Sequence, residues 1–507
     1  MAGGAVARVI RRAVLVTLGG CAGATQTLSG PDHAGGADLS ESRMHARASP
    51  AVAPGEAASA APSITAHEPP TQLPTAPSEG VAVAHNGARV PRADEPDTHE
   101  RIRPIDGPPG LVVEDPSGQA LDAFHVALER AAAGLGQVRI VVYGASHVAS
   151  DLWTYTVRQA LQLRFGDAGH GFILPVKPWR GYRHVGYEPE GDWRAWRTLR
   201  VRTGHLVVDR YGLAGVSVES AQAGARGAIS TPTDTPVGTS ASRFELWFLR
   251  QPGGGRFEAW IDGTLVGIES TDAPAPQAGY ATYVVPDGPH RFEVRVHGDG
   301  PVRLFGLVVE RDEPGVVLDT LGINGARLAI QLHWDEPLWR EHLQRRRPDL
   351  VVLAYGTNEA GDDDVPVERY EAEVHEAVAR VRRAVPEASC VLVGPTDRPY
   401  YDRRRRLATD RPRTRIVADV MRRAAFAHGC GFFDVQAFMG GPMSMVAWVA
   451  ADPPLASPDH VHLTAAGYER LGRALLDALL DGSPWATRAV PTELATTSNT
   501  VGNLALR

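Results

Sequence analysis

Four short motifs, far apart in the chain, contain the residue types that nucleophilic catalysis requires. In chain order they are residues 144–147 (Gly-Ala-Ser-His), 322–326 (Gly-Ile-Asn-Gly-Ala), 356–359 (Gly-Thr-Asn-Glu) and 459–462 (Asp-His-Val-His). A serine becomes a nucleophile when a histidine takes its proton and a carboxylate orients that histidine. The oxygen anion formed by the attack then needs hydrogen-bond donors. Each motif alone is a weak signal, but together and in this order they predict the site of a serine esterase.

Ser146 is the predicted nucleophile, because it follows an apolar run and precedes a helical pattern. Ligands of open α/β sheets bind at such carboxyl ends of strands. His462 is the predicted base and Asp459 its orienting carboxylate, since the three-residue spacing lets the carboxylate fold back onto the ring. His460 is the competing base, but it directly adjoins Asp459 and should point elsewhere.

The predicted oxyanion donors are the amide of Ser146, the amide of Gly325 and the side-chain amide of Asn358. Gly325 stands in a glycine-rich turn, where its N–H can be presented with no side chain in the way. Asn358 follows an apolar run. Taken singly, Gly325 and Asn358 are ordinary loop or cap residues. Their positions after successive strand-like runs favour the oxyanion role.

Alternating apolar runs and helical patterns indicate the elements that must position these residues. The runs predict buried strands at 137–143, 316–318, 350–355, 391–394 and 432–435. Periodic apolar residues predict helices at 151–165, 370–385 and 464–482. This alternation is typical of an α/β fold whose parallel sheet is covered on both faces.

The stretch from 197 to 312 has a different pattern, with period-two runs separated by glycine-rich turns. It predicts an all-β sandwich inserted between the first helix and the second strand of the α/β domain. Trp247, Trp260 and Tyr283 in this stretch suit either the sandwich core or stacking on sugars, and core packing is the more common role.

The N-terminus has the pattern of an export signal, with a basic region followed by a short apolar stretch at 13–18. Leu18-Gly19-Gly20-Cys21 resembles the bacterial lipobox, which predicts lipid attachment at Cys21; the alternative is an incidental cysteine in the leader. Residues 22–112 are rich in Ala, Pro, Gly and Ser and predict a disordered spacer. The tail from 485 is similarly uninformative. No other segment is apolar enough to cross a membrane, so we expect a tethered, soluble body.

The charge and the remaining cysteines constrain the other sites. A net charge of -7 gives no overall attraction to nucleic acid. The basic runs 345–347 and 403–406 are predicted to be solvated, with contact to an anionic envelope polymer as the alternative. The acids 362–364 are better explained by capping of a following helix than by a cation.

Cys390 and Cys430 either form a disulfide or remain buried thiols. No metal site is predicted.

These residues resemble the sequence blocks of the SGNH, or GDSL-type, hydrolases. Ser146, Gly325, Asn358 and His462 match the four residues that give that superfamily its name, and Asp459 matches the triad carboxylate. More narrowly, the stretches 144–151, 164–172, 321–326, 355–359, 439–441 and 459–464 are similar to the peptidoglycan O-acetylesterase branch.

The resemblance implies a flavodoxin-like three-layer α/β fold with an inserted carbohydrate-module-like β-sandwich. The expected divisions are a signal peptide at 1–21, a linker at 22–112, hydrolase segments at 113–196 and 315–484, the insertion at 197–314 and a flexible tail at 485–507. The implied activity is hydrolysis of acetyl esters on cell-envelope glycans, without a cofactor. The implied partners are an acetylated glycan and, through a lipid anchor at Cys21, the membrane of the periplasm or outer membrane.

One residue departs from the superfamily pattern. Its first block usually reads Gly-Asp-Ser, whereas position 145 here is alanine. Two other functions therefore stay open beside hydrolysis. One is acetyl transfer, with a sugar hydroxyl in place of water. The other is glycan binding by a lipoprotein that has kept the fold without activity, which Ala145 alone favours. The sequence does not identify the acetylated polymer or the oligomeric state.

Overall fold

A computed structural model describes residues 111–201 and 208–486 of the chain. Cys21, the predicted signal peptide, most of the spacer and most of the tail lie outside the described residues. Within the described part, none of the helices combines the length and the apolar content that crossing a bilayer would require.

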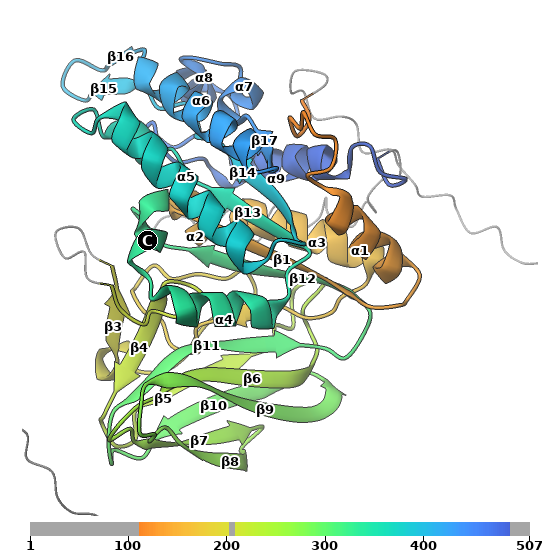
Figure 1. Cartoon of the computed structure of the whole chain (residues 1–507), viewed down its shortest axis with the longest axis vertical. Helices are drawn as coiled ribbons and strands as arrows, with labels where there is room; N and C mark the ends of the chain where they lie inside the picture. Colours follow the sequence, from red (N-terminus) through yellow and green to blue (C-terminus); the bar gives the residue numbers. More distant parts are fainter. Residues whose placement is uncertain (1–110, 202–207, 487–507) are drawn as a thin grey trace, which may run out of the picture. The chain divides into compact units, whose positions relative to one another are not determined.

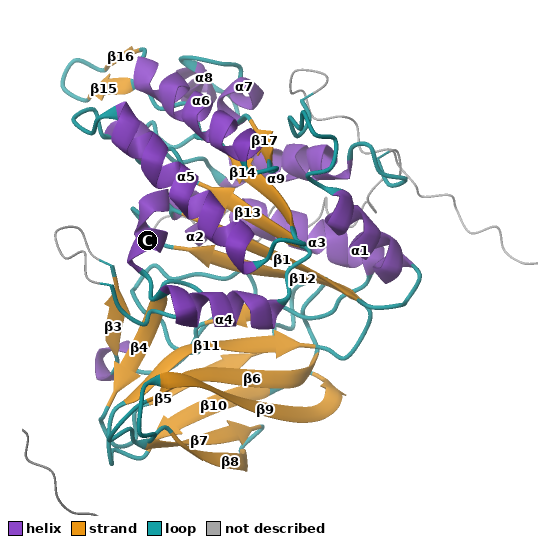
Figure 2. Ribbon diagram, viewed as in Figure 1, coloured by secondary structure: helices purple, strands orange, loops and turns teal. Residues whose placement is uncertain are grey.

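A parallel sheet of five strands forms the centre of the α/β domain (Figure 2). Its order is β12 (Gly315–Gly322), β1 (Gln137–Gly144), β13 (Leu350–Ala354), β14 (Ser389–Val393) and β17 (Gly431–Phe433). Numbered along the chain within this domain, the order is 2-1-3-4-5, which is the order of flavodoxin-like folds. The prediction of a flavodoxin-like α/β domain is therefore confirmed. In such folds the ligand site lies where the order reverses, here between β1 and β13.

Helices cover both faces of this sheet, because its strands are apolar on both sides (Figure 1). In β1, Ile140 and Val142 face one helical layer, and Val141 and Tyr143 face the other. The first layer holds α1 (Asp122–Ala132), α3 (Leu152–Phe165) and α9 (Ala465–Leu480). The second layer holds α4 (Glu336–Arg346), α5 (Val367–Ala384) and α6 (Pro412–Ala427). The shorter helices are α2 (Ser146–Ala149), α7 (Val435–Met439) and α8 (Ser444–Ala450), with 3-10 turns η1 (Trp193–Ala195), η2 (Leu328–His333) and η3 (Glu359–Gly361).

Two antiparallel sheets form the predicted β-sandwich (Figure 1). One has the order β5-β10-β7-β8 and the other β3-β4-β11-β6-β9. The bounds are β3 (Arg197–Arg200), β4 (Val216–Ser220), β5 (Arg226–Ser230), β6 (Ala241–Arg250), β7 (Arg256–Ile261), β8 (Thr264–Ser270), β9 (Gln277–Gly288), β10 (Arg291–Val296) and β11 (Val302–Glu310). A further strand, β2 (Gly171–Ile173), precedes all of these in the chain and pairs antiparallel with β11. The sandwich sheet thus extends into the first hydrolase segment.

The sandwich shares apolar contacts with the α/β domain through β6 and β11, which are buried on both faces. On β6, Phe244 and Leu246 pack between the two sandwich sheets, whereas Trp247 packs toward α4. The Trp247 ring lies 4.8 Å from the ring of His342 on α4. Trp247 is thus a core residue. Tyr283 packs against the core between the sandwich sheets, and Trp260 is half-buried beneath the guanidinium of Arg295.

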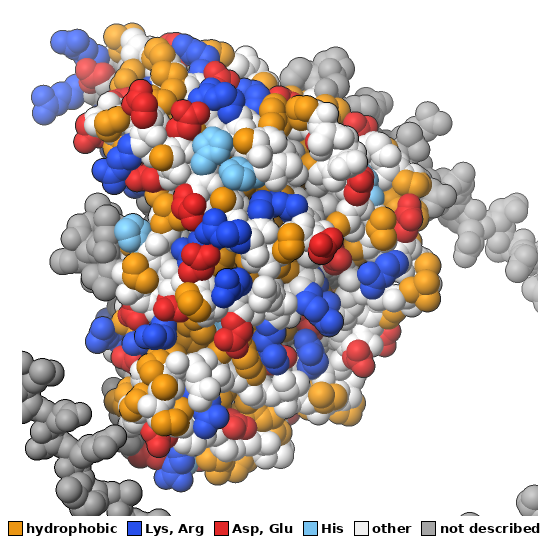
Figure 3. Space-filling view, viewed as in Figure 1, with side chains coloured by type: hydrophobic (Ala, Val, Ile, Leu, Met, Phe, Trp, Pro, Cys, Tyr) orange, Lys and Arg blue, Asp and Glu red, His pale blue; other side chains and the backbone are white. Residues whose placement is uncertain are grey.

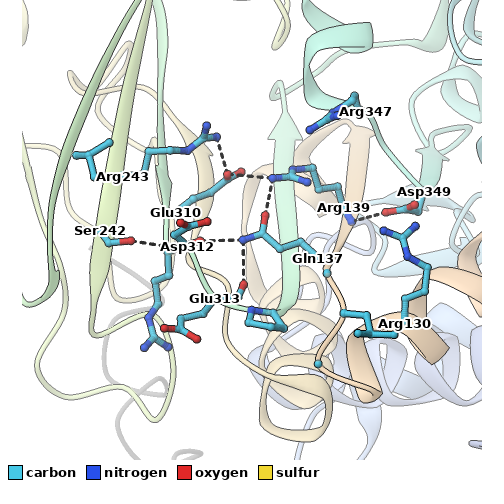
Figure 4. A pocket seen from close by; sticks show the side chains of 16 residues that line it. Arg130, Gln137, Arg139, Ser242, Arg243, Glu310, Asp312, Glu313, Arg347 and Asp349 are labelled. Atoms are coloured by element: carbon cyan, nitrogen blue, oxygen red, sulfur yellow. Dashed lines mark hydrogen bonds and ion pairs between the residues drawn. The ribbon is translucent and has the colours of Figure 1, made fainter.

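A buried ion cluster also joins the two parts. The guanidinium of Arg346 donates to Asp319 of β12 at 2.7 and 3.0 Å and to Glu310 of β11 at 2.7 Å. Glu310 accepts further bonds from Arg139 of β1 at 3.2 Å and from Arg243 of β6 at 2.9 Å (Figure 4). Burial alone would raise the pKa of Glu310, but the three guanidinium groups outweigh it and lower the pKa from 4.5 to about 2.

The prediction that residues 345–347 form a solvated basic run is wrong for Arg346, whereas Arg345 and Arg347 are exposed. Arg345 donates to Glu245 of β6 at 2.6 Å and lies over the Tyr280 ring at 3.8 Å. Arg346 is 3% exposed. The run lies at the end of α4, between the parallel sheet and the sandwich, so the carboxylates of Asp319 and Glu310 replace water around Arg346.

Cys390 and Cys430 form a disulfide, which decides between the two alternatives. Cys390 lies in β14, and Cys430 directly precedes β17, its parallel neighbour. The bond therefore links the starts of two adjacent strands.

Replacing Glu310 by glutamine should lower the free energy of unfolding at pH 7 by about 3–5 kcal/mol, because three guanidinium groups lose a buried counter-charge. The folded-state pKa of Glu310 is lowered, so its contribution is complete above pH 4.5 and is lost as the pH falls toward about 2. The difference between the wild type and Glu310→Gln should shrink over that interval.

Urea unfolding at a series of pH values measures this difference. The control is Glu313→Gln, an exposed carboxylate in the next loop, for which we expect a change below about 0.5 kcal/mol. Equal losses in the two variants, or a difference that does not vary with pH, would contradict the role of the cluster.

Candidate active site

The predicted nucleophile, base and carboxylate form one hydrogen-bonded chain. Ser146 is the first residue of α2, directly after β1, and its Oγ lies 2.8 Å from Nε2 of His462. Nδ1 of His462 lies 2.7 Å from Oδ2 of Asp459. The side chains of His462 and Asp459 are 41% and 36% exposed, so a substrate can reach the group. The hydrogen bonds thus join the loop 459–462, which precedes α9, to the carboxyl end of β1.

The geometry assigns the proton positions, because a carboxylate can only accept. Nδ1–H of His462 donates to Asp459, which leaves Nε2 to accept from the Ser146 hydroxyl. Partial burial would raise the pKa of Asp459. Bonds from the His462 ring, the His462 amide and the Val461 amide outweigh it and hold that pKa well below its usual range. Asp459 is therefore a carboxylate at neutral pH.

The two neighbouring histidines have other partners. His460, the competing base in the sequence, has its Nδ1 3.0 Å from the Pro458 carbonyl and its ring stacked on Tyr401. His147 packs its ring 5.4 Å from that of His462 and has Nδ1 2.9 Å from the Tyr468 hydroxyl. Burial, with the nearby His462, lowers the pKa of His147 from 6.5 to about 3. His147 is thus uncharged at neutral pH and packs against the His462 ring, a role that the sequence did not indicate.

The two loops with the other predicted oxyanion donors are bonded to each other. Nδ2 of Asn358 donates to the carbonyl of Ala326 at 2.8 Å. An amide nitrogen carries two N–H groups, so this bond leaves the second one to donate elsewhere. Gly325 has φ +76°, and a Cβ there would meet no heavy atom within 4 Å. The glycine is thus required by backbone conformation, since the space around it is open.

Two charged residues that the sequence left without a role fix the Asn358 turn. The buried carboxylate of Glu359 accepts from the amides of Gly356 at 3.0 Å and Leu328 at 2.8 Å. Arg398 donates to the carbonyls of Thr357 at 2.5 Å and Asn358 at 3.2 Å. Glu359 was visible only as the last letter of a motif, and Arg398 gave no signal in the sequence.

A buried carboxylate, Asp151, fixes the turn that follows Ser146. Asp151 joins α2 to α3 with a φ of 51° and is 0% exposed. It accepts from Arg158 at 2.8 and 3.2 Å, from Thr320 of β12 at 2.8 Å and from the Val185 amide at 2.8 Å. Because these partners come from three separate segments, Asp151 sets where α2 lies on the sheet.

The side chain of Ala145 is 4% exposed and belongs to an apolar cluster with Tyr143 and Phe172. Position 145, where the superfamily usually has an aspartate, therefore lies in apolar surroundings in this protein. The Asp151 bonds hold the adjacent turn instead.

The acids at 362–364 differ from their predicted capping role. The residue before α5 is Pro366, with no side-chain cap. Asp362 pairs with Arg327 at 2.5 Å, and Asp363 pairs with Arg411 at 2.7 Å. Within the described ranges, no group of three or more His, Cys, Asp or Glu side chains is arranged to hold a metal ion.

Two pockets lie at opposite ends of the parallel strands. A pocket of 390 Å³ adjoins the oxyanion loop and is lined by Asn324, Gly325, Arg327 and Tyr370 among others. A larger one, of 740 Å³, is lined by Gln137 at the start of β1, beside the ion cluster (Figure 4). Seven residue steps along β1 separate that end from Gly144 by about 23 Å, so the larger pocket is remote from Ser146, whereas the smaller one borders the Gly325 loop.

Replacing Asp151 by asparagine should lower kcat for an aryl acetate by about ten-fold or more, because Arg158 loses its buried counter-charge and the Ser146 turn shifts. KM should change less, since Asp151 contacts no substrate. Steady-state kinetics measures both, with Asp122→Asn on the exposed start of α1 as the control. An unchanged kcat in folded Asp151→Asn would show that the turn is held by other groups.

Known proteins match this chain in sequence and in structure. Residues 290–470 match the model of the GDSL-like lipase/acylhydrolase family. A solved peptidoglycan O-acetylesterase is similar at 25% sequence identity and a TM-score of 0.61, over 73% of this chain and 98% of that one. A family two carbohydrate esterase from Clostridium thermocellum matches at 11% identity and a TM-score of 0.26, over 52% and 94%. Among curated proteins no match was found.

The family match includes the Gly325, Asn358 and His462 motifs, and the solved enzyme extends the likeness across most of the described chain. Residues 290–470 therefore form part of a GDSL-like lipase/acylhydrolase domain, and the two matches together support an SGNH-type esterase.

Proposed function

We propose that this protein removes O-acetyl groups from a cell-envelope glycan, with peptidoglycan as the substrate. The observation that carries the proposal is the chain of bonds from Ser146 through His462 to Asp459, at 2.8 and 2.7 Å. The likeness to a peptidoglycan O-acetylesterase at 25% identity supports this choice of polymer.

In the first half-reaction, Nε2 of His462 takes the proton of Ser146 as Oγ attacks the acetyl carbonyl carbon. Asp459 stabilises the imidazolium that forms, since it remains a carboxylate. The amides of Ser146 and Gly325 and the side chain of Asn358 donate to the oxyanion. The tetrahedral intermediate collapses when His462 returns the proton to the sugar oxygen, and the sugar alcohol leaves.

In the second half-reaction, water replaces the sugar. His462 takes a proton from the water, which attacks the acetyl group on Ser146. The second intermediate breaks the bond to Oγ, acetate leaves, and the serine recovers its proton. Both half-reactions use only side chains, amides and water.

The site of action that fits this substrate is the cell envelope. The basic and apolar leader and Cys21 support export followed by lipid attachment. The disulfide between Cys390 and Cys430 suits an oxidising compartment. The spacer before the folded part would give a tethered enzyme reach along the wall.

Ser146→Ala should reduce acetate release from O-acetylated peptidoglycan by about a thousandfold or more, because no acetyl-enzyme can form. Released acetate is measured for the wild type and the variant, in parallel with acetylated xylan as a second polymer. The substitution removes only the Oγ atom of the partly exposed Ser146. The melting temperature should therefore stay close to that of the wild type. Equal turnover by the variant would contradict the triad. Release from xylan alone would contradict the choice of peptidoglycan.

A further inference from the structure

A short hairpin beside the active site presents four consecutive arginines. Strands β15 (Tyr400–Asp402) and β16 (Leu407–Thr409) pair antiparallel, and residues 403–406 form the turn between them. All four turn residues are exposed arginines. Figure 3 shows Lys and Arg side chains gathered where Figure 1 places this hairpin. We call residues 403–406 the arginine turn.

The fold does not use these four guanidinium groups. The turn is fixed by backbone bonds, since Oδ1 of Asp402 accepts from the amides of Arg404 at 2.8 Å and Arg405 at 3.1 Å. Among the described residues, a carboxylate lies within 4 Å of only one of the four, where Arg405 faces Asp402 at 3.7 Å with both side chains exposed. Four like charges in one turn repel each other. They are therefore best explained by a partner outside the chain.

The base of the hairpin contacts the active-site loops on two sides. The ring of Tyr401 stacks on His460, between Asp459 and His462, with centroids 3.8 Å apart and planes at 23°. On the other side, the Tyr400 hydroxyl donates to Asp363 at 3.0 Å, in the segment that follows Asn358. The arginine turn thus extends from the rim of the Ser146 site, anchored to the loop of the base and to the loop of an oxyanion donor.

We propose that the arginine turn binds the carboxylate groups of a polyanionic glycan strand while an acetyl ester of that strand occupies the Ser146 site. The proposal rests on the proposed function and names the charge class of its substrate. A guanidinium matches a carboxylate with two parallel hydrogen bonds. Because the four charges are exposed, their attraction weakens with salt. The chain has a net charge of -7, so this attraction is local to the rim and aligns an anionic strand with the site.

Binding is tested apart from catalysis, with Ser146→Ala as the parent protein. Polygalacturonate carries a carboxylate on each sugar, and its fully methyl-esterified form carries none. We expect the parent to bind the acid form with an affinity that falls as salt is raised, and to bind the ester form far more weakly. R403Q/R404Q/R405Q/R406Q should weaken binding to the acid form by about ten-fold or more.

The matched control is R130Q/R340Q/R383Q/R423Q, which removes four exposed arginines from α1, α4, α5 and α6. Its net charge equals that of the hairpin variant, and its binding should stay within about two-fold of the parent. Equal losses in both variants would overturn the proposal, because net charge alone would then explain the effect. Binding to phosphatidylglycerol vesicles but not to polygalacturonate would overturn it in favour of a membrane surface.

Turnover provides the second measurement, in the background with Ser146 intact. The ratio of kcat/KM for O-acetylated peptidoglycan to that for an aryl acetate should fall about ten-fold in the hairpin variant, through KM. In high salt the wild-type ratio should fall as well, so the difference between the two proteins should disappear. The same ratio for neutral acetylated xylan should not change, and a loss there would overturn the charge-based role. If the wild type released no acetate from peptidoglycan but the turn-dependent binding to polygalacturonate persisted, the proposed function would fail and the binding surface would stand.

Discussion

The buried ion cluster around Arg346 is the interaction on which the arrangement of the two sheets depends. Arg346 lies between Asp319 of the parallel sheet and Glu310 of the sandwich. A charge removed from water is tolerated only when it is paired, so the two parts can meet only where these groups meet. Apolar replacements of such clusters often cost nothing in stability. We infer that the cluster acts chiefly by excluding other ways of packing the sandwich against α4.

The same strand that enters this cluster also sets the geometry of catalysis. On β12, Asp319 binds Arg346 and the next residue, Thr320, binds Asp151 behind the serine turn. The strand then ends at Gly322, which is paired in register with Gly144 at the end of β1. The loop of Gly325 and the turn of Ser146 therefore begin from paired positions. Sandwich placement, oxyanion loop and nucleophile are fixed by one rigid element, which is how preorganised donors are kept in place.

The sequence was sufficient for features that have local patterns. The alternation of apolar runs with helices predicted the sheet, and the motifs at 144–147 and 459–462 predicted that Ser146 and His462 would meet. Features that depend on distant partners could not be predicted. Arg346 stands in a run of arginines that is typical of a solvated surface, and only the sandwich makes it buried. Asp151 was visible in a motif, but its bond to Thr320 joins segments far apart in the chain. Pairing of β2 with β11 had no signal, since three residues are too few for a period.

The pairing of β2 with β11 has a consequence for any attempt to separate the two parts by recombination. β2 comes from the first hydrolase segment, yet it completes a sheet made otherwise from the insertion. Removing residues 197–314 would leave β2 without its partner strand β11. It would also expose the apolar side of α4 against which Trp247 packs. Grafting the insertion elsewhere would expose the edge of β11, a ready site for aggregation. The two parts are interleaved in sequence and share a sheet, so they are not separable as modules.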